Sequence, residues 1–189
     1  MYFQDVDRES GCRLPLPRRE ELDDQGQRIY DSLTDPKGGT VKGLRGPGGI
    51  LLHSPELSRY TRPLNRYLRR EAGLGVRVRE LAILTTAREL NSQFEWAAHE
   101  PEAIRECISL EIIEVIKHRR DSSGLSWGVR SSVRGEMTSD TFVRALQQFG
   151  RRALVDLVAL MGNYAGTPAL QTAFDMQLDP GQPPPLPPL

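Results

Sequence analysis

Apolar residues in the middle of the chain recur at the spacing of an α-helix. If each residue is turned by about 100° from the one before it, the apolar side chains of residues 80–90 share one broad arc. The members of this arc are Leu81, Ile83, Leu84, Ala87 and Leu90. Glu80 falls near the middle of the same arc. The pattern therefore predicts a helix over residues 79–90 that carries one glutamate on its core-facing side.

A glutamate at a core-facing position points to chemistry or to a specific ion pair. An unpaired buried carboxylate is very costly, so Glu80 must be ion-paired, hydrogen-bonded or kept protonated. An ion pair with Arg77 or Arg88 would make it a structural residue. A pKa raised by burial would instead make it a candidate proton donor. The pattern alone leaves both interpretations open.

A second helix is predicted directly after the first. Asn91 or Ser92 is suited to cap it, and Glu95, Trp96 and His99 then share one side of the helix with Ser92. Glu95 and His99 are four residues apart, a spacing at which their side chains can form a hydrogen bond. A histidine oriented by a carboxylate is suited to carrying a proton near neutral pH. The same spacing is also common on exposed helices without function.

The rest of the chain predicts an all-α fold. Further helices are expected over residues 20–33, 54–72, 101–106, 110–120, 141–149, 153–161 and 169–174, with a break at 163–168. We find no internal repeat and no alternating strand pattern of useful length in the sequence. Residues 34–49 contain six glycines and two prolines, which predicts a long loop that either covers a pocket or connects two helices. His53 follows this loop and is either a pocket residue or a packed structural one.

Composition and charge limit the functional classes. The 189 residues include 25 basic and 25 acidic side chains, so we expect no nucleic acid as a partner. Dispersed basic pairs such as Arg69-Arg70 are interpreted as solvated or interface residues. Cys12 and Cys107 belong to no CxxC motif, which argues against a disulfide framework or a dithiol site. No signal peptide or membrane span is predicted, so we expect a cytoplasmic protein without a membrane partner.

The sequence predicts three regions. Residues 1–19 are expected to form an extended N-terminal arm, residues 20–178 one helical domain, and residues 179–189 an extended or disordered proline-rich tail. The tail has a composition that proline-reading modules bind, but an idle tail is the simpler interpretation. Glu80, Glu95 and His99 could ligate a metal, but the chain has no three-ligand spacing signature, so no metal is expected.

Four short motifs can be compared with a known family. They are Arg-Glu-Leu-Ala-Ile-Leu at residues 79–84, Ala-Arg-Glu-Leu at 87–90, Glu-Trp-Ala-Ala-His at 95–99, and Phe-Gly at 149–150 with Leu-Val-Asp-Leu-Val at 154–158. Together they resemble the carboxymuconolactone decarboxylase family, within the superfamily of alkylhydroperoxidase D-like enzymes. The resemblance covers most of residues 20–178. It implies an alkylhydroperoxidase D-like helical bundle that assembles as a homo-oligomer, commonly a trimer or a hexamer.

The peroxidase branch of this superfamily differs from the chain at two positions. That branch has a glutamate, a CxxC pair twelve residues later, and a histidine four residues beyond the second cysteine. Glu80 and His99 match this pattern, whereas Ser92 and Glu95 stand at the two cysteine positions. Dithiol peroxidase chemistry is therefore not expected. The remaining set, Glu80, Glu95 and His99, resembles that of the decarboxylase branch.

The resemblance implies a lyase that needs no cofactor. Its small-molecule substrate would be a carboxylated lactone or a related β,γ-unsaturated acid, and loss of CO₂ would leave a dienolate-like carbon that must be reprotonated. The expected donor is His99 oriented by Glu95, or Glu80 with a pKa raised by burial. The expected substrate-binding residues are Arg45, His53, Ser92 and Trp96, with Arg45 holding the carboxylate.

Two other functions are open alternatives. The same pocket could isomerise, dehydrate or cyclise a larger metabolite without releasing CO₂. The chain could also be a non-catalytic oligomeric binding module that keeps the fold without turnover. Residues 121–138 favour this last alternative slightly, because the chain is shorter there than the family pattern.

Overall fold

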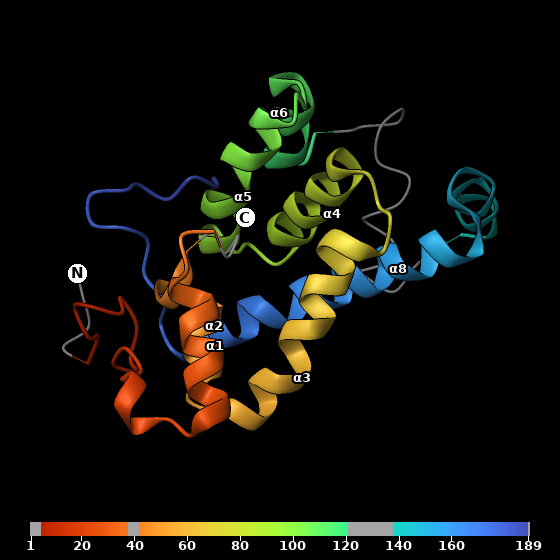
Figure 1. Cartoon of the computed structure of the whole chain (residues 1–189). Helices are drawn as coiled ribbons and strands as arrows, with labels where there is room; N and C mark the ends of the chain where they lie inside the picture. Colours follow the sequence, from red (N-terminus) through yellow and green to blue (C-terminus); the bar gives the residue numbers. More distant parts are fainter. Residues whose placement is uncertain (1–4, 38–41, 121–137, 189) are drawn as a thin grey trace. The chain divides into compact units, whose positions relative to one another are not determined.

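The structure is helical throughout the residues that it describes. It is a computed structural model that describes residues 5–37, 42–120 and 138–188, and no strand occurs within these ranges. The α-helices are α1 (Asp24–Thr34), α2 (Pro47–Leu52), α3 (Pro55–Arg66), α4 (Val76–Glu89), α5 (Gln93–Arg105), α6 (Leu110–Lys117) and α8 (Ser139–Ala173), shown in Figure 1. Short helical turns are η1 (Arg19–Glu21), η2 (Gly43–Arg45) and the π-helical η3 (Tyr67–Glu71). The all-α prediction is confirmed for these ranges. The predicted shortening concerns residues 121–138, of which 121–137 lie outside them.

The chain divides into two compact units. Unit 1 comprises Met1–Leu64 and Ala169–Gln182, and unit 2 comprises Asn65–Pro168 and Pro183–Leu189. The segment 20–178, expected as one domain, therefore contributes to both units. None of the described helices is both long and apolar enough to cross a membrane.

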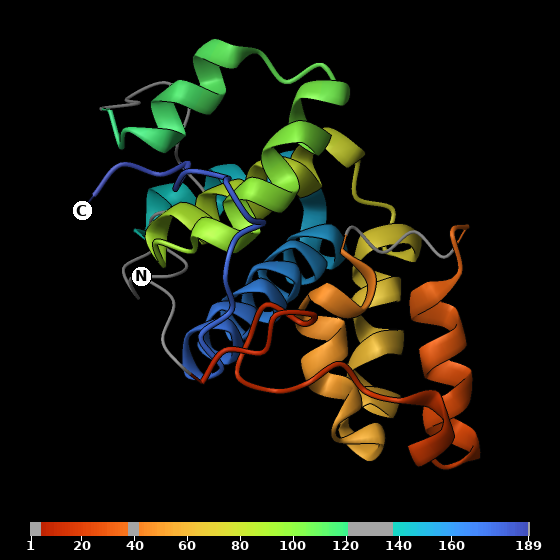
Figure 2. The same ribbon diagram turned by 90° about the vertical axis from the view of Figure 1, so that its left-hand side faces the viewer.

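In unit 2, α4 and α5 pack side by side, and their junction is built as the sequence predicts (Figure 1, Figure 2). The chain leaves α4 through Asn91, whose φ of 51° lies in the left-handed region that asparagine tolerates. Ser92 then caps α5, because its side-chain oxygen accepts a hydrogen bond from the Glu95 backbone N–H at 3.3 Å. Ser109 caps α6 in the same way. These caps fix where each helix begins.

The apolar core of unit 2 consists of two clusters, and α4 contributes to both. One cluster contains Leu84, Ala87, Trp96, Ala103, Ile108, Ile113 and Leu186. The other contains Leu68, Ala82, Ile83, Leu160, Met161 and Tyr164. Residues 82–88 of α4 are all buried, so this helix is covered on more than the single face that the periodicity predicted. Glu80 lies on this central helix.

At two prolines the helices continue where the sequence predicted a boundary. Residues 101–106 were expected to start or kink a helix at Pro101, yet α5 continues through it to Arg105. Ala103, beyond the proline, is completely buried in the same cluster as Trp96. Packing of one continuous face therefore outweighs the roughly 3 kcal/mol that an interior proline costs a helix.

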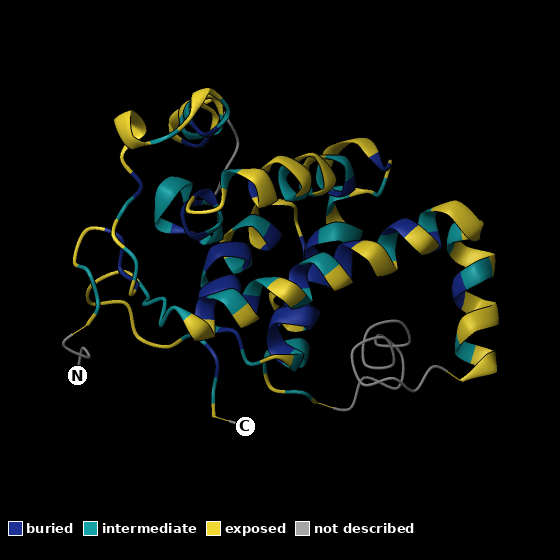
Figure 3. Ribbon diagram, turned by 90° about the horizontal axis from the view of Figure 1, so that it is seen from below, coloured by how far each residue is buried: buried dark blue, intermediate teal, exposed yellow. Residues whose placement is uncertain are grey.

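The predicted break at residues 163–168 is also absent, because α8 runs on through Pro168 to Ala173. Its one non-helical residue is Gly150, with φ 72° and ψ 171°, where two helical segments meet. The buried residues Leu160, Met161 and Tyr164 lie on one side of the continuing helix, whereas Val155 and Val158 are 68% and 43% exposed. Figure 3 shows such alternating buried and exposed stripes along the helices.

Unit 1 departs from the sequence prediction in the glycine-rich segment. Residues 34–49 were expected to be a loop, but η2 forms at Gly43–Arg45 and α2 begins at Pro47. Proline is favoured at the first turn of a helix, where its missing N–H would have no partner anyway. Residues 38–41 of the expected loop lie outside the described part. The arm at residues 5–19 belongs to this unit, where the Arg13 backbone N–H donates to the Phe174 carbonyl oxygen at 2.8 Å.

The proline-rich end of the chain is extended, as predicted, but it packs within unit 2 and is not a tail without contacts. Within unit 2, Leu186 is only 3% exposed and belongs to the cluster around Trp96. Its backbone is hydrogen-bonded to the side chain of Gln93 at the start of α5. One apolar side chain between prolines thus holds this segment in place.

Candidate functional site

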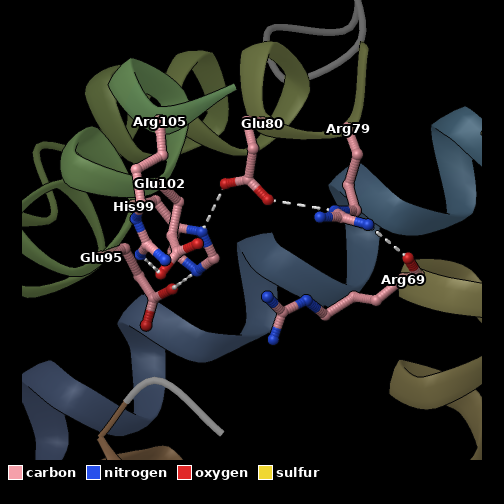
Figure 4. A network of polar contacts seen from close by, with 7 residues as sticks. All are labelled: Arg69, Arg79, Glu80, Glu95, His99, Glu102 and Arg105. Carbon is pink, nitrogen blue, oxygen red and sulfur yellow. Dashed lines mark hydrogen bonds and ion pairs between the residues drawn. The ribbon is translucent and has the colours of Figure 1, made fainter. Parts of the chain in front are cut away.

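Two carboxylates lie beside the imidazole of His99 inside unit 2. The Nδ1 atom of His99 on α5 is 2.8 Å from Oε2 of Glu80 on α4, and its Nε2 atom is 3.7 Å from Oε2 of Glu95 (Figure 4). The side chains of Glu80, His99 and Glu95 are 1%, 4% and 6% exposed. The close hydrogen bond of His99 is made to Glu80 on the neighbouring helix, whereas the sequence analysis expected Glu95 as its partner.

Arg79 holds the second oxygen of Glu80. Its Nε atom donates to Oε1 of Glu80 at 3.0 Å, and its Nη1 atom donates to the backbone carbonyl oxygen of Arg69 at 2.6 Å (Figure 4). That carbonyl belongs to η3, the π-helical turn, a geometry frequent at functional sites. The carboxylate of Glu80 is therefore fixed at both oxygens. The structural ion pair that the sequence suggested exists, but with Arg79 in place of Arg77 or Arg88.

This pairing determines the charge of Glu80. Burial favours the neutral acid and would raise its pKa, but the hydrogen bonds and positive charges of His99 and Arg79 together hold the pKa of Glu80 below its ordinary value. Glu80 is thus a carboxylate at neutral pH, and the expectation that burial makes it a proton donor is wrong. An ionised Glu80 only accepts, so the Nδ1–H group of His99 donates to it. The Nε2 atom lies on the side of Glu95, 3.7 Å from its Oε2 atom.

An aromatic ring closes one side of the histidine. The ring of Tyr164 on α8 meets His99 edge-on, with centroids 5.2 Å apart and an angle of 84° between the planes. Burial raises the pKa of Tyr164 well above its ordinary value, so its phenol stays neutral. This contact restricts the imidazole orientation and supplies a neutral wall next to the two carboxylates.

Arg69 adds a positive charge to the same region. Its charge acts on Tyr164, as do the charges of Glu95, Glu80 and Arg79, so all of these groups lie around that ring. The buried Nε–H of Arg69 has no hydrogen-bond partner among the described residues. Figure 4 shows its side chain extending below Glu80 toward the side of Glu95. A guanidinium in this situation is suited to bind a carboxylate.

Sequence reasoning missed Arg69, Arg79 and Tyr164 as site residues. Arg69 was interpreted as one of the dispersed solvated basic pairs, and nothing local distinguishes it from its neighbour Arg70. Arg79 was part of the quoted motif, but its fold-back onto the adjacent Glu80 has no sequence signal. Tyr164 follows Leu160 at helical spacing, which a continuous α8 would have indicated.

Two predicted substrate-binding residues of α5 have structural roles. Ser92 is 8% exposed and caps α5 through its hydroxyl group. Trp96 is completely buried in the apolar cluster with Leu84 and Ile113. Its indole Nε1–H has no hydrogen-bond partner among the described residues. Both residues hold the helix that carries His99.

The other two predicted substrate-binding residues, Arg45 and His53, belong to unit 1. The guanidinium of Arg45 lies against Gly11, and its Nη1 atom is 3.6 Å from Oδ1 of Asp179. The Nε2 atom of His53 is 2.9 Å from the carbonyl oxygen of Pro15. His53 does line a pocket, a cavity of about 700 Å³ within this unit. Each of the two residues thus has its own partners in unit 1, and nothing here groups them with His99.

The described residues contain no cluster of three or more histidine, cysteine, aspartate or glutamate side chains arranged to hold a metal ion. Comparison with models of known families, with curated proteins and with solved structures found no match for this chain. The resemblance to carboxymuconolactone decarboxylases therefore continues to rest on the sequence motifs.

Proposed function

We propose that unit 2 carries an acid–base site of a lyase, in which His99 transfers a proton to a small carboxylated substrate. The observation that supports this most is the arrangement of His99, with Nδ1 hydrogen-bonded to an ionised Glu80 and Nε2 facing Glu95. A carboxylate fixed by Arg79 holds one tautomer and orientation of the ring and stabilises the positive charge when the ring is protonated. The sequence motifs suggest the same class of reaction.

The proposed reaction is decarboxylation without a cofactor. The bond between the carboxylate and its carbon breaks, CO₂ leaves, and the electron pair stays on the substrate as a dienolate. The protonated Nε2 of His99 then delivers one proton to carbon, and the ring recovers a proton from water. Glu80 remains ionised throughout, and Glu95 faces the nitrogen that exchanges the proton.

We assign substrate binding to Arg69 in place of Arg45. The Nε–H of Arg69 has no hydrogen-bond partner among the described residues, and its charge lies close to Tyr164 in the unit that carries His99. The buried Nε–H of Arg45 likewise has no partner among these residues, but this guanidinium lies in unit 1, where its Nη1 atom is 3.6 Å from Oδ1 of Asp179. A planar guanidinium can hold a carboxylate through two parallel hydrogen bonds. The motifs suggest a carboxylated lactone as the substrate, and the same site would suit a related β,γ-unsaturated acid.

One observation favours a second function, that of a non-catalytic oligomeric module. The side chains of Glu80, Glu95 and His99 are at most 6% exposed, which also suits a purely structural polar network. In that case the network would specify packing of α4 against α5, and the chain would consume no metabolite.

The experiment is a screen for CO₂ release and ultraviolet change on carboxymuconolactone and related acids. It compares the wild-type chain with His99→Ala and with His118→Ala, a matched control because His118 is an exposed histidine at the C-cap of α6. The lyase proposal expects activity that is lost in His99→Ala and kept in His118→Ala. Wild-type activity that survives in His99→Ala would overturn the role of His99. No activity from a folded wild-type chain would favour the non-catalytic module.

We also propose that the chain forms a homo-oligomer, as the family resemblance implies. The apolar residues Phe142 and Val143 before Gly150, and Val155 and Val158 after it, are exposed on α8, and association would cover such residues. Light scattering after size-exclusion chromatography measures the mass directly. A monomer of 21.2 kDa would contradict this proposal.

A further inference from the structure

The last residues of the chain are bound to unit 2 in the way a peptide ligand is bound. Figure 2 shows the C-terminal end of the chain running beside α5. Residues 183–188 read Pro-Pro-Pro-Leu-Pro-Pro, and Leu186 is their one large apolar side chain that can enter a core. It is 3% exposed and packs in the cluster with Trp96 and Ile113. A single leucine thus anchors an otherwise proline-built segment.

The carboxamide of Gln93 binds the backbone on both sides of this leucine. The Leu186 N–H donates to Oε1 of Gln93 at 2.8 Å, and Nε2 of Gln93 donates to the Leu186 carbonyl oxygen at 3.2 Å. Proline has no backbone N–H, so Leu186 carries the one backbone donor within residues 183–188. A shift by one residue in either direction would place a proline opposite Oε1 and lose this hydrogen bond. The Gln93 side chain therefore fixes the register.

A third hydrogen bond extends the contact toward the C-terminus. The Nη1 atom of Arg88, at the end of α4, donates to the Pro187 carbonyl oxygen at 3.3 Å and also to Oδ1 of Asn91 at 3.0 Å. With the segment in place Arg88 is 3% exposed, and its hydrogen bond to Asn91, which does not involve the segment, orients the guanidinium. The proline-rich segment is likewise pre-organised, because extended proline segments lose little conformational freedom on docking. The two sides of the contact thus fit each other with little reorganisation.

We propose that Gln93, Arg88 and the apolar cluster around Trp96 form a binding site for extended peptides in which a leucine is flanked by prolines. Its occupant in the free chain is the chain's own C-terminal segment, residues 183–188. Leucine occupies the apolar cluster, Gln93 recognises its backbone, and Arg88 recognises the following carbonyl group. This site is separate from the proposed chemistry at His99 and does not depend on it.

The test uses a fluorescent peptide of residues 181–188 and three full-length proteins. They are the wild type, Leu186→Asp, which releases the segment and empties the site, and Leu186→Asp with Gln93→Ala, which also removes the backbone recognition. Fluorescence anisotropy measures binding, and circular dichroism verifies folding. We expect the peptide to bind Leu186→Asp, and the double variant at least about tenfold more weakly, the scale of losing two hydrogen bonds. A peptide with Leu186→Ala should fail to bind any of them.

The wild type supplies the competition control. Its tethered segment is present at an effective concentration on the order of millimolar, so the free peptide should bind about tenfold or more weakly than to Leu186→Asp. Equal binding to the single and the double variant would overturn the role of Gln93. Absence of binding to a folded Leu186→Asp chain would overturn the site itself.

A second measurement avoids the released variant. In the wild type, the Leu186 amide should exchange its hydrogen slowly, because its partner is the side chain of Gln93. Gln93→Ala should accelerate this exchange at least about tenfold, while the Ile113 amide in α6 keeps its rate. Unchanged exchange at Leu186 in Gln93→Ala would contradict the proposal.

Discussion

The proton transfer that we propose for His99 would depend on a carboxylate that belongs to a different helix. Helical periodicity predicted that Glu80 faces the core. The cost of burying an unpaired carboxylate then predicted that Glu80 has a partner. The sequence analysis predicted Glu95 as the partner of His99, because contacts between residues four apart on one helix can be predicted from spacing. The hydrogen bond to Glu80 spans 19 residues and arises from packing of α4 against α5. The sign of the Glu80 pKa shift follows from these partners, so periodicity could not supply it.

Glu80→Gln should destabilise the chain. The substitution keeps the size of the side chain but leaves the partly buried guanidinium of Arg79 without its anion, at 16% exposure. Removing one partner of a buried ion pair costs about 3 kcal/mol, so we expect the free energy of unfolding to fall by that amount. Urea denaturation followed by circular dichroism measures it. Glu114→Gln, on the exposed pair with His118, should change it by less than about 0.5 kcal/mol. Equal effects of the two substitutions would contradict this account.

The substitution Arg69→Ala should affect substrate binding more than proton transfer. If Arg69 holds the substrate carboxylate, its loss should raise KM about tenfold to 100-fold, the scale of a charge-assisted hydrogen bond of about 1.5–3 kcal/mol. The value of kcat should change less, because Glu80 and His99 keep their hydrogen bond. Steady-state kinetics on the substrate identified by the screen gives both constants. Arg77→Ala, an exposed arginine one turn before Glu80, is the control that should leave KM unchanged.

At the scale of helices, the sequence predicted most elements but placed several ends wrongly. The capping residues Ser92 and Ser109 act where they were expected, because a cap is a local hydrogen bond. Pro101 was expected to start or kink a helix and residues 163–168 to break one, but both prolines lie inside continuous helices. Ala103, beyond Pro101, is buried in the cluster with Trp96, so tertiary packing carries α5 across this proline. Local propensity contains no information about that packing.

Two glycines of α8 should respond to alanine in opposite directions. Gly150 has φ 72°, where an alanine is strained, so Gly150→Ala should lower the free energy of unfolding by about 1 kcal/mol. Gly162 is helical and exposed, with open space at its Cβ position, so Gly162→Ala should raise it by about 0.5–1 kcal/mol. Thermal unfolding and urea denaturation of both variants test the pair. A stabilising Gly150→Ala would show that the kink between the two segments of α8 is not needed.

For the whole chain, the charge pattern predicts how stability depends on acid. The chain as a whole carries no formal net charge, so composition alone gives no direction for this dependence. The folded structure gives one, because several carboxyl groups have a pKa below the ordinary value. Backbone hydrogen bonds lower the pKa of Asp7, Arg19 lowers that of Asp31, and Lys42 lowers that of Asp179. Glu80 shifts in the same direction through His99 and Arg79, against its burial.

The resulting prediction is a loss of stability on acidification. A group whose pKa is lower in the folded chain contributes stability that is complete above its unfolded value and is lost as the pH falls through its folded value. For Glu80 the ordinary value is 4.5, so the free energy of unfolding should begin to fall below about that pH. Urea denaturation at a series of pH values from neutral to acidic measures the curve. Glu80→Gln should flatten it, because glutamine does not titrate, whereas Glu114→Gln should leave it unchanged. A wild-type curve that rises on acidification, or one that Glu80→Gln leaves unaltered, would show that Glu80 is not held as a buried carboxylate.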